Sequence, residues 1–103
     1  MSHDPGFPTL SAKEQLILSL LIDGPELYGL ELVSRSNGLL KRGTVYVTLG
    51  RMEDKGYVES EVEARRPGAV GLPRRLYRPT ALGRKVLDAW TTLHATLTWG
   101  TTP

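Results

Sequence analysis

Hydrophobic residues in the first third of the chain recur with the period of an α-helix. Ser11-Ala12-Lys13-Glu14 has the sequence of a capping box, in which the Ser and Glu side chains accept hydrogen bonds from free backbone amides at a helix start. Apolar residues then surround most of the helix up to about Ile22, and Asp23-Gly24-Pro25 ends it. Such a helix needs cover on two sides. A domain of this size covers one side itself, so we expect a second subunit on the other.

A shorter helix is predicted next, from Pro25 to about Ser34. Proline is common in the first turn of a helix, where its missing N–H costs no hydrogen bond. Leu27, Leu30 and Val33 recur at helical spacing, so we expect them to face the core.

The segment from Thr44 to Lys55 is predicted as an amphipathic helix that follows a turn at Asn37-Gly38. The apolar stripe of this helix consists of Val45, Leu49 and Met52. The opposite face is polar and basic, with one small apolar side chain; it consists of Thr44, Val47, Thr48, Arg51 and Lys55. Gly56 ends the helix. The order of helix, short helix, turn and amphipathic helix is that of a helix-turn-helix unit.

Polar and apolar residues then alternate, as in an exposed strand. Val58, Ser60 and Val62 alternate with glutamates within the predicted strand 57–64, residues 65–74 form a loop, and 75–79 form the returning strand. A hairpin after the third helix is the wing of a winged helix-turn-helix. Thr80 is expected to cap a last helix, from 81 to about 99, which ends at Gly100.

The last helix would be roughly 28 Å long at 1.5 Å per residue, which is longer than the preceding body can cover. We therefore expect it to pair with the same helix of a second copy. The predicted fold class is mainly α with a small β-hairpin, a winged helix-turn-helix plus a long C-terminal dimerisation helix. The expected organisation is a flexible N-terminal arm at 1–9, a DNA-binding domain at 10–80 and the dimerisation helix at 81–100.

Composition narrows the function classes. A chain of 103 residues has room for one domain, and 40% hydrophobic with 23% charged residues is ordinary for a soluble globular protein. No apolar run reaches bilayer length and the first residues do not resemble a signal peptide, so we expect a cytoplasmic protein without membrane contact. The absence of cysteine excludes disulfides and thiolate chemistry.

Charge is segregated along the chain although the net charge is only +2. The segment from Arg65 to Lys85 contains no acid, and its cations are Arg65, Arg66, Arg74, Arg75, Arg78, Arg84 and Lys85. Such a segment indicates a localised contact with a polyanion. Alternatively, the arginines pair across the hairpin with glutamates, which we expect more of Arg75 and Arg78 than of Arg65 and Arg66.

With these elements placed, the sequence resembles the PadR family of bacterial winged helix-turn-helix transcription regulators, specifically its short-tailed members with one C-terminal helix. The resemblance spans about residues 10–99 and rests on three motifs. These are Leu27-Tyr28-Gly29-Leu30-Glu31-Leu32; Gly43-Thr44-Val45-Tyr46 through Arg51-Met52-Glu53 to Gly56-Tyr57-Val58; and Arg74-Arg75-Leu76-Tyr77-Arg78 with Thr80 and Gly83-Arg84. Val47 stands where the family usually has proline, and Gly50 replaces a usual arginine, which removes a phosphate contact and costs about 1 kcal/mol of helix stability.

The resemblance implies that the third helix reads DNA, where arginine suits guanine and threonine or valine suits the thymine methyl group. Expected base or adjacent phosphate contacts are Thr44, Val47, Thr48 and Arg51, and expected phosphate contacts are Lys41, Arg42 and Lys55. The wing arginines expected at the minor groove or its phosphates are Arg65, Arg66, Arg74 and Arg75. Tyr46 lies between Gly43 and Gly50, where another backbone could come close; its family counterpart lies near a phosphate, and a packing role is the alternative. For Tyr28, core packing is expected.

The resemblance also implies a dimer, whose interface is expected to include Leu16, Leu20, Val86, Trp90, Leu93 and Leu97. Some short family members bind flat aromatic molecules between tryptophans at this interface, which makes Trp90 a candidate for a small aromatic effector, with packing as the alternative. Trp99 lies nine residues on, about half a turn away from Trp90 around the helix. The two tryptophans therefore cannot face the interface in the same way.

Catalytic and metal sites are not expected. His3 and His94 have no cysteine or carboxylate at ligand spacing, and no nucleophile stands beside a base, so we predict neither metal, cofactor nor enzymatic activity. The predicted function is a homodimeric repressor that binds an inverted-repeat operator and is released by a small-molecule inducer. The alternatives are an aromatic small-molecule sensor at the dimer interface and a winged-helix protein-interaction module.

Overall fold

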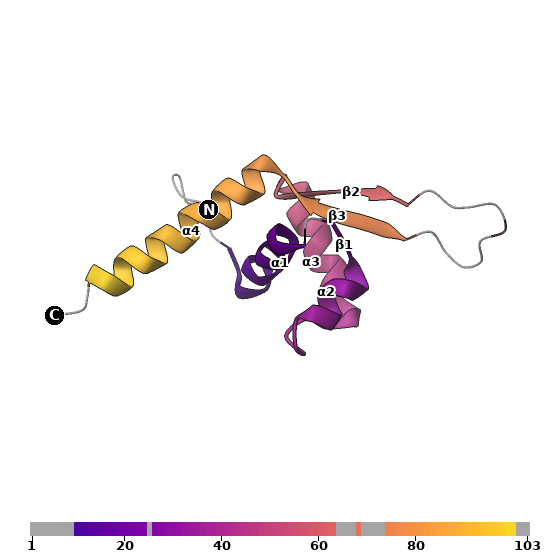
Figure 1. Cartoon of the computed structure of the whole chain (residues 1–103), viewed down its shortest axis with the longest axis horizontal. Helices are drawn as coiled ribbons and strands as arrows, with labels where there is room; N and C mark the ends of the chain where they lie inside the picture. Colours follow the sequence, from indigo (N-terminus) through magenta and orange to yellow (C-terminus); the bar gives the residue numbers. More distant parts are fainter. Residues whose placement is uncertain (1–9, 25, 64–67, 69–73, 101–103) are drawn as a thin grey trace, which may run out of the picture.

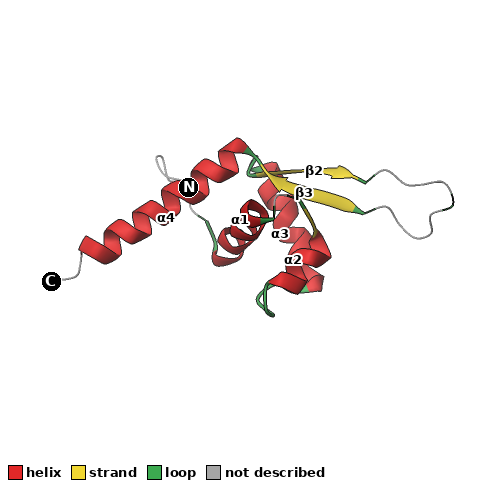
Figure 2. Ribbon diagram, viewed as in Figure 1, coloured by secondary structure: helices red, strands yellow, loops and turns green. Residues whose placement is uncertain are grey.

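The computed structural model describes residues 10–24, 26–63, 68 and 74–100, with the backbone alone for 94–100. Figures 1 and 2 show helices gathered beside a small sheet, with a hairpin and a long last helix leaving the body at opposite ends. The elements are α1 (Ala12–Asp23), β1 (Leu27–Tyr28), α2 (Gly29–Arg35), α3 (Arg42–Asp54), β2 (Val58–Val62), β3 (Arg75–Pro79) and α4 (Ala81–Gly100). The predicted mainly α fold with a small β-hairpin and a long last helix is confirmed, and dimerisation through that helix stays a prediction. The N-terminal arm, Pro25 and the wing loop with Arg65 and Arg66 lie outside the described residues.

The sheet is antiparallel with the strand order β1-β3-β2, so the last strand in sequence is the middle one. The predicted hairpin of β2 and β3 is confirmed. The helix predicted from Pro25 was wrong in its start, because Leu27 and Tyr28 form β1 and pair with Tyr77 and Leu76. Pairing with a distant strand satisfies backbone groups that a local helix turn would otherwise have satisfied.

The start of α2 at Gly29 changes which of its residues face inward. Leu27, which belongs to β1, is buried, and Leu32 on α2 is completely buried. Leu30, which was expected to face the core, is 45% exposed. Val33 packs against the core and is partly buried. The inward face of α2 is therefore shifted from the one that the sequence predicted.

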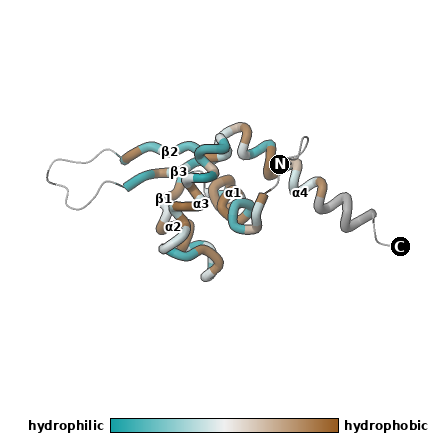
Figure 3. Tube along the Cα trace, turned by 180° about the vertical axis from the view of Figure 1, so that it is seen from behind, coloured by the Kyte–Doolittle hydropathy of each residue, from teal (hydrophilic) through white to brown (hydrophobic). Residues whose placement is uncertain are grey.

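The core lies between α1, α3, the sheet and the first turns of α4. Figure 3 shows hydrophobic residues concentrated where α1 and α3 face one another. The predicted apolar stripe of α3 is confirmed, because Val45, Leu49 and Met52 are at most 1% exposed. Burial of such a side chain contributes about 1.5–3 kcal/mol. The largest completely enclosed side chains are Ile17, Leu18, Leu21, Leu32, Leu40, Leu49, Met52, Val45 and Val58.

The predicted capping box of α1, the glycine that ends α3 and the threonine cap of α4 are confirmed. The Ser11 hydroxyl accepts from the Glu14 N–H at 3.1 Å, and the Glu14 carboxylate accepts from the Ser11 N–H at 2.9 Å. Gly56 follows α3 with a φ of +80°, a conformation that glycine adopts without strain. Thr80 caps α4, because its hydroxyl accepts from the Gly83 N–H at 2.9 Å. The same hydroxyl donates to the Gly56 carbonyl at 2.5 Å, so one side chain ties the end of α3 to the start of α4.

The first turn of α4 lies directly against the turn between α3 and β2. A Cβ atom added to Gly83 would lie 2.1 Å from the Tyr57 carbonyl oxygen, so only glycine fits there. From this point α4 passes α1 and continues beyond it (Figure 1). None of the helices in the described residues is long and apolar enough to cross a membrane.

The residues expected at a dimer interface differ in how much of their surface is exposed to solvent in the single chain. Leu16, Leu20 and Trp90 are partly buried against the core. Val86 is only 5% exposed because it packs into the core of its own chain, so it offers little surface to a second copy. Leu93 is half-buried, and the side chains of Leu97 and Trp99 lie outside the described residues.

Candidate nucleic-acid interface

The face of α3 opposite its buried stripe is open to solvent. Thr44, Val47 and Arg51 are exposed, Thr48 is half-buried, and Val47 keeps 56% of its surface although it is apolar. The Thr48 hydroxyl donates weakly to the Thr44 carbonyl at 3.4 Å. The burial of Val45, Leu49 and Met52 holds this face outward, as the helical period predicted. This face therefore presents the methyl groups of Val47, the hydroxyl groups of two threonines and the guanidinium group of Arg51.

Three cations, two at the start of α3 and one in its last turn, have no acidic partner in the described residues. Lys41, Arg42 and Arg51 are exposed, and within the described part of the chain none of them forms an ion pair. Their positive charge is free to attract an anion, because no carboxylate neutralises it.

Lys55 differs from the other cations of α3. Its ammonium donates to Glu14 Oε2 at 2.8 Å, and the Glu14 side chain is only 7% exposed. Burial acts to raise the pKa of Glu14, but hydrogen bonds from Lys55 and Ser11 outweigh it and hold the pKa below its ordinary value of 4.5. The pair thus joins the end of α3 to the start of α1. The sequence predicted a phosphate contact for Lys55, and within the protein its ammonium group binds the Glu14 carboxylate.

Glu14→Gln tests the contribution of this ion pair to stability. At pH 7 the free energy of unfolding is expected to fall by about 1 kcal/mol, because a charge-assisted hydrogen bond is lost while the amide still accepts from Ser11. The folded-state pKa lies below the unfolded one, so the stabilisation is present above about pH 4.5 and is lost as the pH falls through the lower folded value. Urea unfolding of both proteins at pH 7 and pH 3 checks this. If the two proteins differed in free energy of unfolding by the same amount at both pH values, the stabilising role of the Glu14 charge would be contradicted.

Tyr46 combines a packing role with exposure. A Cβ atom at Gly29 would lie 2.5 Å from its ring, so the ring rests on the start of α2, yet 48% of the residue is exposed. No described atom lies within 4 Å of a Cβ at Gly43 or Gly50. The close contact that involves Tyr46 is therefore made at Gly29, a position that the sequence did not single out for it.

A cluster at the base of the hairpin ties the wing to α2. The Tyr28 hydroxyl donates to Glu63 Oε2 at 2.5 Å, and Arg74 pairs with Glu63 at 3.3 Å while its guanidinium lies 4.0 Å from the Tyr28 ring centre. The hydrogen bond to Glu63 raises the pKa of Tyr28. Tyr28, which was expected only to pack, is thus a polar anchor of the wing. Knowledge of the pairing between β1 and β3 would have predicted this role of Tyr28, because it places Tyr28 beside the hairpin, but the sequence did not reveal that pairing.

The two arginines on β3 are also engaged. Arg75 donates to the Ser60 hydroxyl at 3.1 Å. Arg78 pairs with Glu59 at 2.9 Å and Glu61 at 2.7 Å. Pairing with glutamates across the hairpin, the alternative to a polyanion contact, is therefore found for Arg78. Arg75 bonds a hydroxyl across the hairpin and forms no ion pair among the described residues. No group of acids, histidines or cysteines in the described residues could hold a metal ion.

The exposed face of α3 is bordered by a groove on each side. One lies between this face and the first turn of α1, and its α1 wall consists of Ser11, Lys13 and Glu14. The other lies between α2, α3 and β3, and it contains Tyr28, Tyr46 and Tyr77 with Arg74 and Arg75. A convex helix between two grooves, bearing free cations, hydroxyls and methyl groups, is suited to enter the major groove of a nucleic acid duplex.

Comparisons with known proteins agree with this geometry. The model of the family described as "Transcriptional regulator PadR-like family" matches residues 17–89. A PadR family transcription regulator from hypervirulent Clostridium difficile R20291 is 27% identical with a TM-score of 0.69, covering 85% of this chain and 92% of that one. A PadR family transcriptional regulator from Eggerthella lenta DSM 2243 is 29% identical with a TM-score of 0.69, covering 84% and 75%. No curated protein sequence gives a match.

Bacillus subtilis PadR, solved in complex with operator DNA, has the same fold. It is 23% identical with a TM-score of 0.69, and the match covers 79% of this chain and 47% of that one. This chain therefore aligns with about half the length of that protein.

Proposed function

The chain belongs to the transcriptional regulator PadR-like family, and on that premise we propose that it is a homodimeric repressor that binds an inverted-repeat operator in double-stranded DNA. The family consists of transcriptional regulators, not enzymes. The observation that carries the proposal is the exposed face of α3, where Lys41, Arg42 and Arg51 have no carboxylate partner in the described residues. The operator complex of the Bacillus subtilis relative supports it by analogy.

In the proposed complex α3 enters the major groove. Arg51 donates to a guanine edge, Thr44, Val47 and Thr48 contact thymine methyl groups or adjacent phosphates, and Lys41 and Arg42 bind phosphates. Arg65 and Arg66 in the wing contact the flanking minor groove or its phosphates. Arg74 and Arg75, which are engaged at the wing base, hold the wing in place and contribute positive charge.

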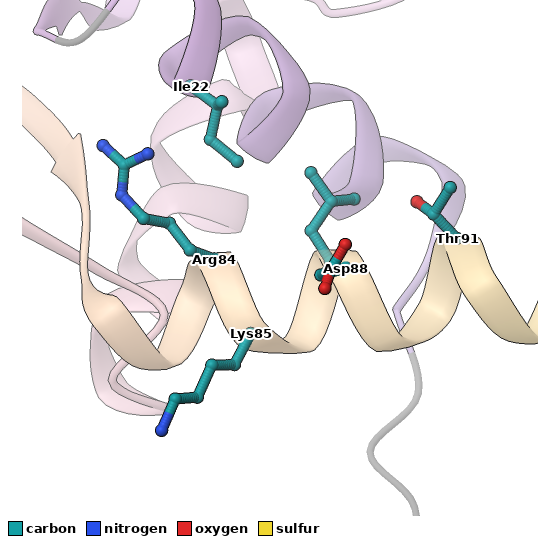
Figure 4. A pocket seen from close by; sticks show the side chains of 6 residues that line it. Ile22, Arg84, Lys85, Asp88 and Thr91 are labelled. Atoms are coloured by element: carbon teal, nitrogen blue, oxygen red, sulfur yellow. The ribbon is translucent and has the colours of Figure 1, made fainter.

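The proposed dimer uses α4 and the outer side of α1. Leu16, Leu20, Trp90, Leu93 and Leu97 supply its apolar surface. Figure 4 shows the space between the end of α1 and α4, with Ile22 above it and Arg84, Lys85, Asp88 and Thr91 along α4. Two copies joined in this way would place their α3 helices in successive major grooves, with half-sites about 10 bp apart or a multiple of that.

Release from DNA would follow from a small molecule that prefers a dimer with wrongly spaced α3 helices. Trp90 at the proposed interface is the candidate to stack on a flat aromatic effector. Repression itself would come from occlusion of the promoter.

The test is binding of the purified protein to its own promoter and to random duplex over a range of salt concentrations. A preference for the promoter, with affinity that falls as salt rises, is expected. Equal, salt-insensitive affinity for both duplexes would contradict the proposal. Light scattering tests the dimer, and a stable monomer would favour the protein-interaction alternative instead.

A further inference from the structure

The groove between the first turn of α1 and the exposed face of α3, here the α1–α3 groove, has a pattern of charge that the DNA-reading face alone does not explain. Its walls are Ser11, Lys13 and Glu14 on α1 and Thr44, Val47, Thr48, Arg51 and Lys55 on α3. Cations thus stand on both walls, and the hydroxyl groups of Ser11, Thr44 and Thr48 also line the groove.

The acid in the groove does not cancel these cations. Among the described residues, Glu14 is the one carboxylate that lines the groove, and both of its oxygens are engaged, one with the Ser11 N–H and the other with Lys55. Lys13 is exposed and forms no ion pair in the described residues. After the pair of Glu14 and Lys55 is set aside, Lys13 and Arg51 leave the groove positive, which suits an anion.

Lys55 remains able to bind an anion while it holds Glu14. An ammonium group has three N–H donors, the hydrogen bond to Glu14 occupies one of them, and the Lys55 side chain is 44% exposed. The buried carboxylate therefore fixes the ammonium in the groove wall without using all of its donors.

We propose that the α1–α3 groove receives a phosphate of the DNA backbone, bound by Lys13 from α1 and Lys55 from α3, and that Glu14 is the positioning residue that holds Lys55 in place. The inference rests on the proposed function. A helix in the major groove runs between two phosphate backbones, and α1 forms a wall beside α3 where one of these backbones passes. Lys13, which the sequence did not mark as a DNA contact, thereby becomes one.

The first experiment measures binding to promoter and random duplex against salt concentration for the full chain, Lys13→Ala and the control Arg35→Ala. A plot of log K against log salt concentration has a negative slope, and each lost phosphate contact makes this slope less steep by about 0.9. For Lys13→Ala we expect that decrease, with affinity for both duplexes reduced several-fold by the same factor. Arg35 is an exposed cation at the end of α2 that lines neither groove beside α3, and its variant should match the wild type.

The second experiment tests the positioning role of Glu14 at pH 7 with Glu14→Gln, Lys55→Met and the double variant. If Glu14 positions Lys55 for the phosphate, the affinity lost on Lys55→Met is smaller in the Glu14→Gln background. Additive losses would overturn the positioning role. An unchanged salt slope in Lys13→Ala would overturn the phosphate site and leave the proposed function intact. Absence of salt-dependent DNA binding by the wild type would overturn both.

Discussion

Gly83→Ala is expected to destabilise the protein by about 3 kcal/mol or more, the upper end of what overpacking costs. The added Cβ would lie 2.1 Å from the Tyr57 carbonyl oxygen and 3.2 Å from the Leu18 side chain. The closer neighbour is backbone and cannot turn away, so the first turn of α4 must separate from the turn that follows α3. For a domain of this size the melting temperature should fall by more than about 10 °C.

Gly50→Ala is the matched control, because it makes the same change in a helix. Apart from the adjacent residues and the nearby backbone of α3 itself, no described atom lies within 4 Å of a Cβ at Gly50, and alanine is favoured over glycine in a helix by about 1 kcal/mol. This variant should therefore melt at the same or a higher temperature. Thermal unfolding followed by circular dichroism compares the two. Equal melting temperatures for both variants would show that α4 does not pack on the Tyr57 carbonyl as described.

Arg51→Ala is expected to weaken binding to the operator by about 1–3 kcal/mol, which is roughly five- to 150-fold, and to reduce discrimination between operator and random duplex. Arg51 is exposed and has no ion-pair partner among the described residues, so its loss should change stability by no more than about 0.5 kcal/mol. Affinities for operator and for random duplex, measured at one fixed salt concentration, give the ratio of operator to random binding.

Arg35→Ala removes the same charge from the end of α2 and serves as the control. It should keep the ratio of operator to random binding, whereas Arg51→Ala should lower it. A wild-type ratio in Arg51→Ala would mean that Arg51 contacts only phosphate or no DNA at all.

Features set by neighbouring residues could be predicted from the sequence. The capping box of Ser11 and Glu14, the end of α3 at Gly56 and the cap by Thr80 each depend on residues three or four positions away. The exposed face of α3 was predictable for the same reason, because a helix with Val45, Leu49 and Met52 buried must present the other side to solvent.

Features set by distant residues could not be predicted. Leu27 and Tyr28 form a strand only because β3 supplies the partner, and no local pattern reveals that pairing. The same limit applies to the site, where the sequence predicted Lys55 as a phosphate contact but did not reveal that it pairs with Glu14 on another helix. Which cations are free is a property of the packed molecule, and it decides which can attract DNA.

The strand order has a consequence for how the chain folds during synthesis. β1 and β2 both hydrogen-bond to β3 and not to each other, so neither has a partner until residues 75–79 have left the ribosome. Pairing between distant segments must wait for the intervening chain and is slow compared with local contacts. A nascent chain that stops before Arg75 is therefore expected to stay unfolded and to be open to proteolysis, because no smaller part of it can complete the sheet.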